Sequence, residues 1–398
     1  MLVLKAYKTE IDPNNVQRTL LAKHAGTARY AWNWGLSRRI AEYQATGQSS
    51  NAIEQHRQLN ALKAECFPWM YEVSKCAPQE ALRDLDQAFQ HFFRRCSEGK
   101  GKVGFPKFKR KKRGLGGFRL TGRIAIASHQ IQLPRLGWLR LKESNYLPVK
   151  AKINSVTVRE RAGRWFVSVQ VEEEIAVSDN QGEAIGLDLG LKSLIVGSDG
   201  SALESPKPLN RSLKRLRKLS RQHSGKQKGS QNRKKSARKL AKLHYRISCQ
   251  RADFLHKATS ELARNKSLIA VENLKVSGML KNHCLARSIS DAGWSELVRQ
   301  LEYKSLWHGS QLVKIDRFFP SSKVCSGCGA IKDELPLSER RYHCEVCGLV
   351  MDRDLNAARN ILHWSMGSSP RIDASEDQPV GAVVERGTER FSSYVKKE

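Results

Sequence analysis

Four cysteines form the clearest chemical pattern in this sequence. They lie in CSGC and CEVC, two C-x2-C pairs with fifteen residues between them: Cys325, Cys328, Cys344 and Cys347. Two such pairs close a tetrahedral Zn²⁺ site with Zn–S distances of about 2.3 Å. Because all four positions are filled by protein, we expect one structural zinc that folds a small insert. A redox dithiol is the alternative, and His343 could replace one cysteine as a ligand.

Three carboxylates lie in apolar elements or at their edges. Asp188 lies in the strand-like IGLDLG, Glu272 ends the apolar run of LIAVEN, and Asp354 begins the helix-like DRDLNAARNIL. An isolated buried carboxylate is costly, and several together are tolerated only when a hard cation neutralises them. If these three side chains converge, they form an oxygen site suited to Mg²⁺ or Mn²⁺.

Each of these carboxylates also has an ordinary structural interpretation. Asp188 could belong to a turn or an ion pair, Glu272 to a helix cap through Asn273, and Asp354 to a first helical turn favoured by the dipole. Spacing along the chain does not establish convergence. The pattern alone leaves a shared metal site and three separate roles open.

The charge balance indicates a polyanionic partner. Lys and Arg number 70 against 39 Asp and Glu, a formal net charge of +31 in 398 residues. Nucleic acid suits such an excess, and an anionic membrane surface is the alternative. No apolar run reaches the roughly 18 residues of a membrane-spanning helix. Since the N-terminal MLVLKAYKTEIDP lacks a signal peptide, we expect a bacterial or archaeal cytoplasm in which the cysteines stay reduced.

Two segments concentrate the positive charge. Residues 99–120, GKGKVGFPKFKRKKRGLGGFRL, mix Lys and Arg with Phe in a Gly-rich loop, which suits a phosphate backbone and stacked bases. Residues 211–246 hold 15 Lys or Arg and no acidic residue, and their leucines predict two helices with a cationic outer face. A solvated charged surface is the plain alternative. The candidate nucleic-acid contacts in these segments are Lys107, Lys109, Arg110, Arg215, Lys218, Arg233, Lys234 and Arg238.

The periodicity outlines the elements that must position these groups. Alternation predicts one strand at the N-terminus and several between 123 and 174, typical of a small β-barrel or meander, and helical spacing runs through 15–98. From residue 182 the pattern becomes α/β, with apolar strands around Asp188, at Leu194 to Val196, and at SLIAVEN and QLVKIDRFF. The last 33 residues have no period, and we expect them to be disordered.

The motifs GLDLG, VENL, FPSSKVCSGCG, CEVCG and DRDLNAARNI, in this order, resemble those of the TnpB family. Its members are RNA-guided DNA endonucleases of insertion-sequence transposons, related to type V CRISPR effectors. RYAWNWGL, QEALRDL and GFPKFKR are similar to the family as well, and only the C-terminal tail lies outside the resemblance.

The resemblance implies a multi-domain α+β protein. An RNase H-like (RuvC) α/β nuclease domain with a zinc-ribbon insert would follow an N-terminal β-barrel (wedge) domain with a helical recognition insertion. The expected segments are 1–14 (first barrel strand), 15–98 (helical insertion), 99–180 (rest of the barrel), 181–320 (nuclease domain with the basic helices), 321–350 (zinc ribbon), 351–365 (last part of the nuclease domain) and 366–398 (disordered tail).

The resemblance also implies the catalytic residues. Asp188, Glu272 and Asp354 would hold two Mg²⁺ or Mn²⁺ ions about 3.5–4 Å apart, which activate a water and stabilise the leaving 3′ oxygen. Asp188 would bridge both ions, and Asn356 would orient the ligands as a neutral hydrogen bonder. Asp354 is preferred to Asp352 because the family motif places the ligand two residues before the Asn of NAA, and Asp352 is the fallback.

The implied partners are a guide RNA from the transposon end and a target DNA duplex that is cut beside a short protein-read motif. Lys75 and Gln79, one helical turn apart, resemble the motif-reading position, although helix capping or surface roles suit them as well. We favour a monomer, although the sequence leaves the oligomeric state open.

Three other functions stay open. A nuclease-inactive RNA-guided DNA-binding repressor is one, although the intact acidic trio argues against it. A transposase of RNase H fold is another, although no separate helix-turn-helix for binding transposon ends is evident. The third is a zinc-ribbon RNA-binding protein, which leaves the carboxylates unexplained.

Overall fold

The protein is a mixed α/β molecule with two compact units. The computed structural model describes residues 1–99, 103–111, 114–336 and 338–367. Parts of the expected basic loop and nearly all of the expected tail lie outside these residues. The first unit comprises Met1–Val177 and Pro208–Ala252, and the second Ser178–Lys207 and the chain from Asp253 onward. The basic helices thus group with the N-terminal unit by contacts, whereas the expected domain boundaries remain predictions.

Two antiparallel sheets form the framework of the first unit. The predicted N-terminal strand pairs with a strand more than 150 residues later, from Leu2 opposite Glu174 to Ile11 opposite Trp165. A single bridge between Ile11 and Leu141 lies between the two sheets. Closure into a barrel stays a prediction. The four-stranded sheet has the order β1 (Leu2–Ile11), β7 (Arg164–Glu174), β6 (Lys152–Arg161), β2 (Gly117–Leu120), and the three-stranded sheet the order β3 (Ala125–Ile126), β4 (Gln130–Leu133), β5 (Gly137–Arg140).

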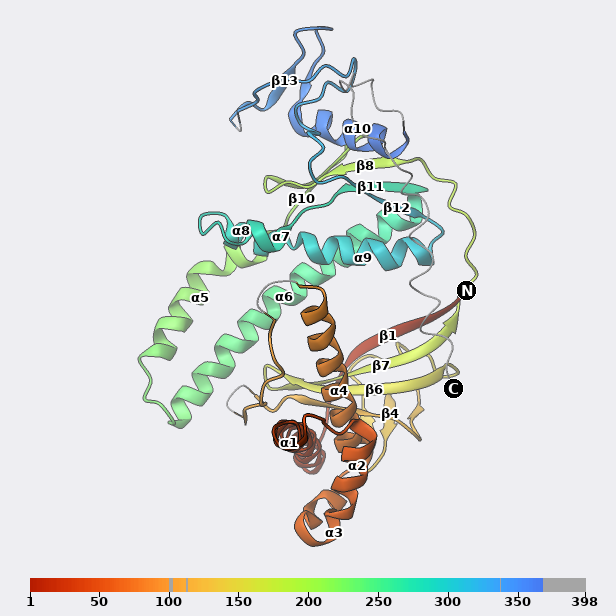
Figure 1. The fold of residues 1–398 in the computed structure, drawn as a ribbon. Helices are drawn as coiled ribbons and strands as arrows, with labels where there is room; N and C mark the ends of the chain where they lie inside the picture. The colour runs from red at the N-terminus through yellow and green to blue at the C-terminus, as the bar shows by residue number, and fades with distance from the viewer. Residues whose placement is uncertain (100–102, 112–113, 337, 368–398) are drawn as a thin grey trace. The chain divides into compact units, whose positions relative to one another are not determined.

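The expected helical segment folds as helices that pack on one another (Figure 1). The first helix begins with a capping box between Asn14 and Gln17 and ends at Gly47, whose φ of 71° favours glycine. Leu21, Leu36 and Leu82 are completely buried in this unit. The helices are α1 (Asn15–Thr46), α2 (Ala52–Ala61), α3 (Lys63–Cys66), the 3₁₀ helix η1 (Pro68–Glu72) and α4 (Cys76–Ser97).

The basic segment forms two helices, as predicted. They are α5 (Pro208–Ser224) and α6 (Gln231–Asn265), and the division between the two units falls within α6. Leu216, Leu243 and Ile247 are buried between them, so one apolar stripe leaves the charged faces outside. The ring of Tyr245 in α6 packs on the ring of Phe166 in β7, with 5.4 Å between the two ring centroids.

A five-stranded sheet organises the second unit. Parallel pairing joins β8 to β11 and β11 to β12, while β9 and β10 continue the sheet antiparallel beyond β8. Parallel neighbours need long crossover connections, and helices supply them here. The strands are β8 (Ile185–Asp188), β9 (Ser193–Gly197), β10 (Ala202–Glu204), β11 (Leu268–Glu272) and β12 (Gln311–Ile315), and the helices between β11 and β12 are α7 (Val276–Met279), α8 (Ala286–Ala292) and α9 (Trp294–Trp307).

Helices cover both faces of this sheet (Figure 1). Ile185 and Leu187 of β8 and Ile269 and Val271 of β11 form a core with residues of α9 and the end of α6. Ala270, on the opposite face, packs with Ile361 of α10 (Arg353–Ser365). A short hairpin of β13 (Arg341–His343) and β14 (Val350–Asp352) precedes α10. Within the described residues, we find no helix both long and apolar enough to span a membrane.

Candidate functional site

The strand register brings Asp188 and Glu272 together. Strands β8 and β11 are parallel, and the pair Leu187–Val271 immediately precedes the two acidic residues. Both carboxylates therefore stand at the carboxyl ends of neighbouring strands. Because side chains alternate along a strand, Asp188 shares its face with Gly186, and Glu272 shares its face with Ala270. This is the face that α10 covers.

A glycine lets α10 approach this face. A Cβ on Gly186 would lie 2.2 Å from the carbonyl oxygen of Ala358 and 2.7 Å from the amide nitrogen of Leu362. Only glycine permits backbone-to-backbone contact this close. Since Asp354 lies in the first turn of the same helix, the close approach carries its carboxylate toward the strand ends.

The charges of Glu272 and Asp354 act on Asp188. Burial, together with the negative charges of Glu272 and then Asp354, raises the pKa of Asp188 to about 8. Burial also raises the pKa of Glu272, and a hydrogen bond from Ser321 opposes that rise. The fold thus places the three carboxylates near enough for their charges to interact, whereas their role as metal ligands stays a prediction. Raised pKa values mean that the ionised carboxylates are destabilised there, and a bound cation would relieve this destabilisation.

Asp352 and Asp354 have different positions in the structure. Asp352 caps α10, where its Oδ1 accepts hydrogen bonds from the amides of Asp354 at 2.9 Å and Leu355 at 3.2 Å. Its carboxylate is therefore engaged by the helix N-terminus, which leaves Asp354 as the better candidate ligand. The choice of Asp354 over Asp352 remains a prediction.

The acidic group has the donor chemistry of a divalent-cation site but a looser arrangement than the cysteines. Its ligands are carboxylate oxygens, which Mg²⁺ and Mn²⁺ prefer. In the described parts of the chain, the four cysteines are the group whose ligand atoms all lie within 4.8 Å of one another. A bound cation would therefore have to bring the three carboxylates closer together. The residues suit a divalent cation because their donors are oxygens, because Asp188 and Glu272 are partly buried, and because their negative charges repel one another without it.

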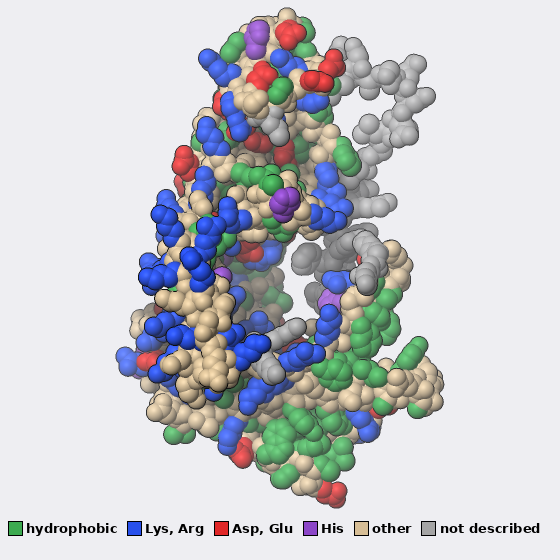
Figure 2. All heavy atoms as spheres, turned by 90° about the vertical axis from the view of Figure 1, so that its left-hand side faces the viewer, with side chains coloured by type: hydrophobic (Ala, Val, Ile, Leu, Met, Phe, Trp, Pro, Cys, Tyr) green, Lys and Arg blue, Asp and Glu red, His purple; other side chains and the backbone are tan. Residues whose placement is uncertain are grey.

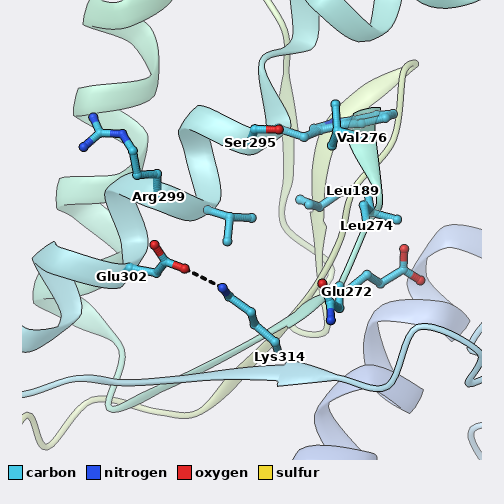
Figure 3. A pocket seen from close by; sticks show the side chains of 11 residues that line it. Leu189, Glu272, Leu274, Val276, Ser295, Arg299, Glu302 and Lys314 are labelled. Atoms are coloured by element: carbon cyan, nitrogen blue, oxygen red, sulfur yellow. Dashed lines mark hydrogen bonds and ion pairs between the residues drawn. The ribbon is translucent and has the colours of Figure 1, made fainter. Parts of the chain in front are cut away.

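A pocket of about 220 Å³ opens beside Glu272 (Figure 3). Its wall includes Leu189 and Leu274 on one side and the ion pair of Lys314 with Glu302 on the other. In Figure 3 the Glu272 side chain points away from that ion pair. Lys314 thus pairs with Glu302 and not with Glu272, so the Glu272 carboxylate is directed away from that lysine.

The predicted cysteine cluster is present and compact. The Sγ atoms of Cys325 and Cys347 lie 3.6 Å apart, as do those of Cys328 and Cys344. Four sulfurs bound at about 2.3 Å to a tetrahedral Zn²⁺ lie roughly 3.8 Å from one another, so the residues fit this ion. His343 is exposed on β13 and does not belong to the group.

The two cysteine pairs have the same backbone conformation. The amide of Gly329 donates to the carbonyl of Cys325, and the amide of Gly348 donates to that of Cys344, each at 2.9 Å. Both glycines have positive φ, 81° and 72°, which explains why each C-x2-C is followed by glycine. Tyr342 is completely buried against Cys325 and Cys344 and forms most of the small core of this module.

A basic groove of about 950 Å³ lies in the first unit. Predicted contacts from both basic segments meet there, because Lys107, Lys109 and Arg110 line it together with Arg238 of α6. Arg119 and Arg159 add charge that sequence analysis did not single out. Figure 2 views the side on which α5 and α6 lie in Figure 1 and shows many Lys and Arg side chains there.

Helix α1 anchors the basic loop. Trp32 Nε1 donates to the carbonyl of Lys107 at 3.1 Å, and Asn33 exchanges two hydrogen bonds with the backbone of Lys109, at 2.7 and 3.0 Å. The Lys109 ammonium lies 3.6 Å from the centre of the Trp32 ring, and burial lowers the pKa of this lysine to about 8. Lys109 thus lines the groove with its ammonium already engaged by an aromatic ring.

The other predicted contacts are distributed over the helices. Arg215, Lys218 and Lys234 are exposed on α5 and α6. Arg233 instead donates to the carbonyls of His223 and Lys226 and so closes the turn between the two helices. In the helical segment, Lys75 is exposed at the start of α4, and Gln79 is half-buried one turn later.

Sequence analysis missed several residues that support the acidic site. Ser321 Oγ donates to Glu272 Oε1 at 2.8 Å, and Asn360 Nδ2 donates to the carbonyl of Ser321 at 2.8 Å. Asn356, expected to orient the metal ligands, directs the hydrogen bonds of its carboxamide to Val324 and Ser326, beside Cys325. The sequence feature that could have indicated the two asparagines is their spacing: Asn356 and Asn360 lie four positions apart on the buried face of the helix DRDLNAARNIL.

Three family models match the chain. They are described as "Probable transposase" over residues 166–283, "Cas12f1-like, TNB domain" over 294–361 and "Helix-turn-helix domain" over 1–48. The sequence analysis found no separate helix-turn-helix for binding transposon ends, whereas the last model carries that description for residues 1–48. Over those residues, however, the structure forms one strand, β1, and one long helix, α1.

Relatives extend over nearly the whole chain. A "Putative RNA-guided DNA endonuclease" of Streptomyces pristinaespiralis is 39% identical and covers 94% of this chain and 93% of its own. The "Putative RNA-guided DNA endonuclease InsQ" of Escherichia coli (strain K12) is 32% identical, with 90% and 92% covered. On this similarity, the chain belongs to the TnpB family of RNA-guided DNA endonucleases.

Among solved structures, the mini-RNA-guided endonuclease CRISPR-Cas phi3 aligns over 90% of this chain and 92% of that chain, at 9% identity and a TM-score of 0.44. A TM-score below 0.5 does not establish a common fold. The family assignment therefore rests on the sequence relatives.

Proposed function

We propose that this protein is an RNA-guided DNA endonuclease that cuts double-stranded DNA beside a short motif read by the protein. Its guide RNA would derive from the transposon end. The observation that carries the proposal is the meeting of Asp188, Glu272 and Asp354 at one end of a parallel strand pair, in a chain whose relatives bear the name RNA-guided DNA endonuclease.

The second unit would be a RuvC-like nuclease domain of RNase H fold. Its support is the sheet in which antiparallel β10, β9 and β8 continue into parallel β11 and β12. The cysteine module at 321–350 would be a zinc ribbon inserted before the last helix of that domain. The β-sheets of the first unit would be the wedge domain, with α1–α4 as its recognition insertion.

The three carboxylates would hold divalent cations. Two Mg²⁺ or Mn²⁺ ions bound there would supply an activated water and a stabilising charge for the leaving 3′ oxygen. Asp188, on which the charges of both Glu272 and Asp354 act, would ligate both ions, and Glu272 and Asp354 one each. Ser321 would hold Glu272 in place, and Asp352 would fix the start of the helix that carries Asp354.

The zinc ion at Cys325, Cys328, Cys344 and Cys347 would be structural. Four protein ligands leave no position for a substrate or a water. The core of this module is small, consisting mainly of Tyr342 and two of the cysteines. Metal binding would therefore provide much of its folding free energy.

The basic groove of the first unit would bind nucleic-acid backbone. Its arginines and lysines neutralise phosphates without reading bases, which suits a protein that leaves sequence recognition to base pairing with a guide. Lys75 and Gln79 at the start of α4 remain our candidates for reading the adjacent motif. A monomer would suffice, since all three carboxylates of the acidic group lie within the described residues of one chain.

The experiment is to purify the protein with its RNA, sequence that RNA, and reprogram it against a plasmid. We expect Mg²⁺-dependent cutting at the programmed site, and loss of cutting by roughly a thousandfold or more in Asp188→Ala, because the cation site is removed. Guide RNA retention should be unchanged in the variant. If RNA binding persists while Asp188→Ala cuts at the wild-type rate, the assigned site is wrong.

The same experiment tests the alternative functions. A "Probable transposase" model matches residues 166–283, so strand joining is the second candidate. Joined transposon-end products, in place of double-strand breaks, would identify a transposase. Programmed binding without cutting by the wild-type protein would identify a guided repressor.

A further inference from the structure

Ser321 connects the acidic site with the cysteine module. It lies four residues before Cys325 and is 6% exposed. Its hydroxyl donates to Glu272 Oε1 at 2.8 Å, which engages one of the two carboxylate oxygens. Its carbonyl accepts a hydrogen bond of 2.8 Å from Asn360 Nδ2 of α10. One buried serine thus contacts both a candidate metal ligand and the helix that carries another.

Two buried asparagines of α10 hold the first cysteine pair. Asn360 and Asn356 both donate to the carbonyl of Val324, at 2.6 and 2.7 Å. The amide of Ser326 donates to Asn356 Oδ1 at 2.9 Å. Both neighbours of Cys325 in the chain are therefore bonded to α10. Since these groups are buried, leaving such a bond unmade costs more than the bond contributes when made.

These contacts form one continuous path. It runs from Cys325 through Val324 and Ser326 to α10, and from α10 through Ser321 to Glu272. Zinc at Cys325 would restrain this segment further and so help to keep Ser321 in reach of Glu272. Loss of that zinc would weaken the restraint on the hydrogen bond from Ser321 to the Glu272 carboxylate.

We propose that Ser321 is a positioning residue for Glu272 and that it couples the two metal sites, so that zinc at the cysteines strengthens divalent-cation binding by the carboxylates. This inference rests on the proposed function. Hydrogen bonds from such supporting residues commonly change metal affinity 10–100-fold. A coupling between two binding sites is reciprocal, so a divalent cation at the carboxylates must also strengthen zinc binding.

The first test measures Mn²⁺ binding by calorimetry on the full-length, zinc-loaded, nucleic-acid-free protein. We expect Ser321→Ala to weaken Mn²⁺ binding roughly 10–100-fold while keeping one zinc per chain. Ser321→Thr, which retains a hydroxyl, should bind within a few-fold of wild type. Ser322→Ala is the matched control, since it removes the neighbouring hydroxyl from the same segment, and it should bind like wild type.

The second test uses the reciprocity of the coupling. In the presence of a zinc-selective chelator, added Mg²⁺ should raise the zinc occupancy of the wild-type protein and of Ser322→Ala but leave that of Ser321→Ala unchanged. A merely structural role for Ser321 would lower zinc occupancy equally with and without Mg²⁺. If Ser321→Ala does not fold, the Mg²⁺ effect on wild-type zinc occupancy and the Mn²⁺ affinity of Ser321→Thr decide.

The inference is overturned if Ser321→Ala binds Mn²⁺ with wild-type affinity. It is also overturned if added Mg²⁺ does not change the zinc occupancy of the wild-type protein. Asp188→Ala separates this failure from a failure of the proposed function. If Asp188→Ala also binds Mn²⁺ like wild type, the acidic site itself is misassigned. If it loses Mn²⁺ while Ser321→Ala does not, only the coupling is wrong.

Discussion

Gly186 of β8 and Ala358 of α10 meet backbone to backbone: a Cβ added to the glycine would lie 2.2 Å from the alanine carbonyl oxygen. This contact sets the distance between the strand that ends in Asp188 and the helix that begins beside Asp354. Gly186, the first of the two glycines in IGLDLG, is therefore as much a part of the acidic site as Asp188.

Gly186→Ala should displace α10 from the sheet. The clash is with backbone atoms, which cannot rotate away as a side chain would, so we expect a loss of roughly 2–4 kcal/mol in the free energy of unfolding. Cutting should fall with it, because Asp354 moves. Urea unfolding and plasmid cleavage measure the two effects. Gly278→Ala is the control, since a Cβ there meets only the Lys275 side chain, at 3.7 Å or more. Equal behaviour of the two variants would contradict the role of Gly186.

Asp188 should make the metal-free protein sensitive to pH. Its pKa is about 8 in the folded protein and about 3.9 in an unfolded chain. Between these values the folded state holds a proton that the unfolded state has lost. The free energy of unfolding therefore falls as pH rises from about 4 to about 8.

Asp188→Asn removes this dependence because its amide does not ionise. In Mg²⁺-free buffer the variant should be more stable than wild type by roughly 1–3 kcal/mol at pH 8, with the difference vanishing near pH 4. Urea unfolding at several pH values tests this, with Asp253→Asn, an exposed substitution on α6, as the control. A stability difference that is the same at every pH would show that Asp188 does not titrate in this way.

Cys325→Ser should abolish zinc binding. Cys325 is completely buried beside Tyr342, so three remaining thiolates would have to hold the ion with the core of the module opened. We expect elemental analysis to find about one zinc per wild-type chain and far less in the variant, with the module destabilised by several kcal/mol. Cys284→Ser, at an exposed cysteine outside the cluster, is the matched control. Undiminished zinc in Cys325→Ser would rule out the site.

Arg238→Ala should weaken nucleic-acid binding in a salt-dependent manner. Arg238 is exposed and lines the basic groove. Loss of one phosphate contact lowers the slope of log affinity against log salt by about 0.9 for duplex DNA, or about 0.7 for a single strand. Filter binding of the guide RNA across a salt series measures this. Lys152→Ala, whose ammonium pairs with Glu172 outside the groove, should leave the slope unchanged. A slope unaltered by Arg238→Ala would place the nucleic acid elsewhere.

Patterns carried by neighbouring residues were readable from the sequence. The cysteine site follows from two C-x2-C pairs with fifteen residues between them. The strands around Asp188 and Glu272, the leucine stripe between the basic helices and the helix at DRDLNAARNIL are likewise set by local periodicity. Each depends on interactions within a few residues, which composition and spacing record directly.

The proximity of the three carboxylates depended on the tertiary structure, because contacts between segments more than 80 residues apart produce no recognisable spacing in the sequence. The pairing of β8 with β11 and the approach of α10 at Gly186 decided that three separate carboxylates share one end of a sheet. The fold also decided which polar side chains face inward, and so distinguished the cap Asp352 from Asp354 and turned Asn356 toward the cysteines. The hydrogen bond from Ser321 to Glu272 also depends on the tertiary structure, because burial determines which acceptor the serine hydroxyl can reach.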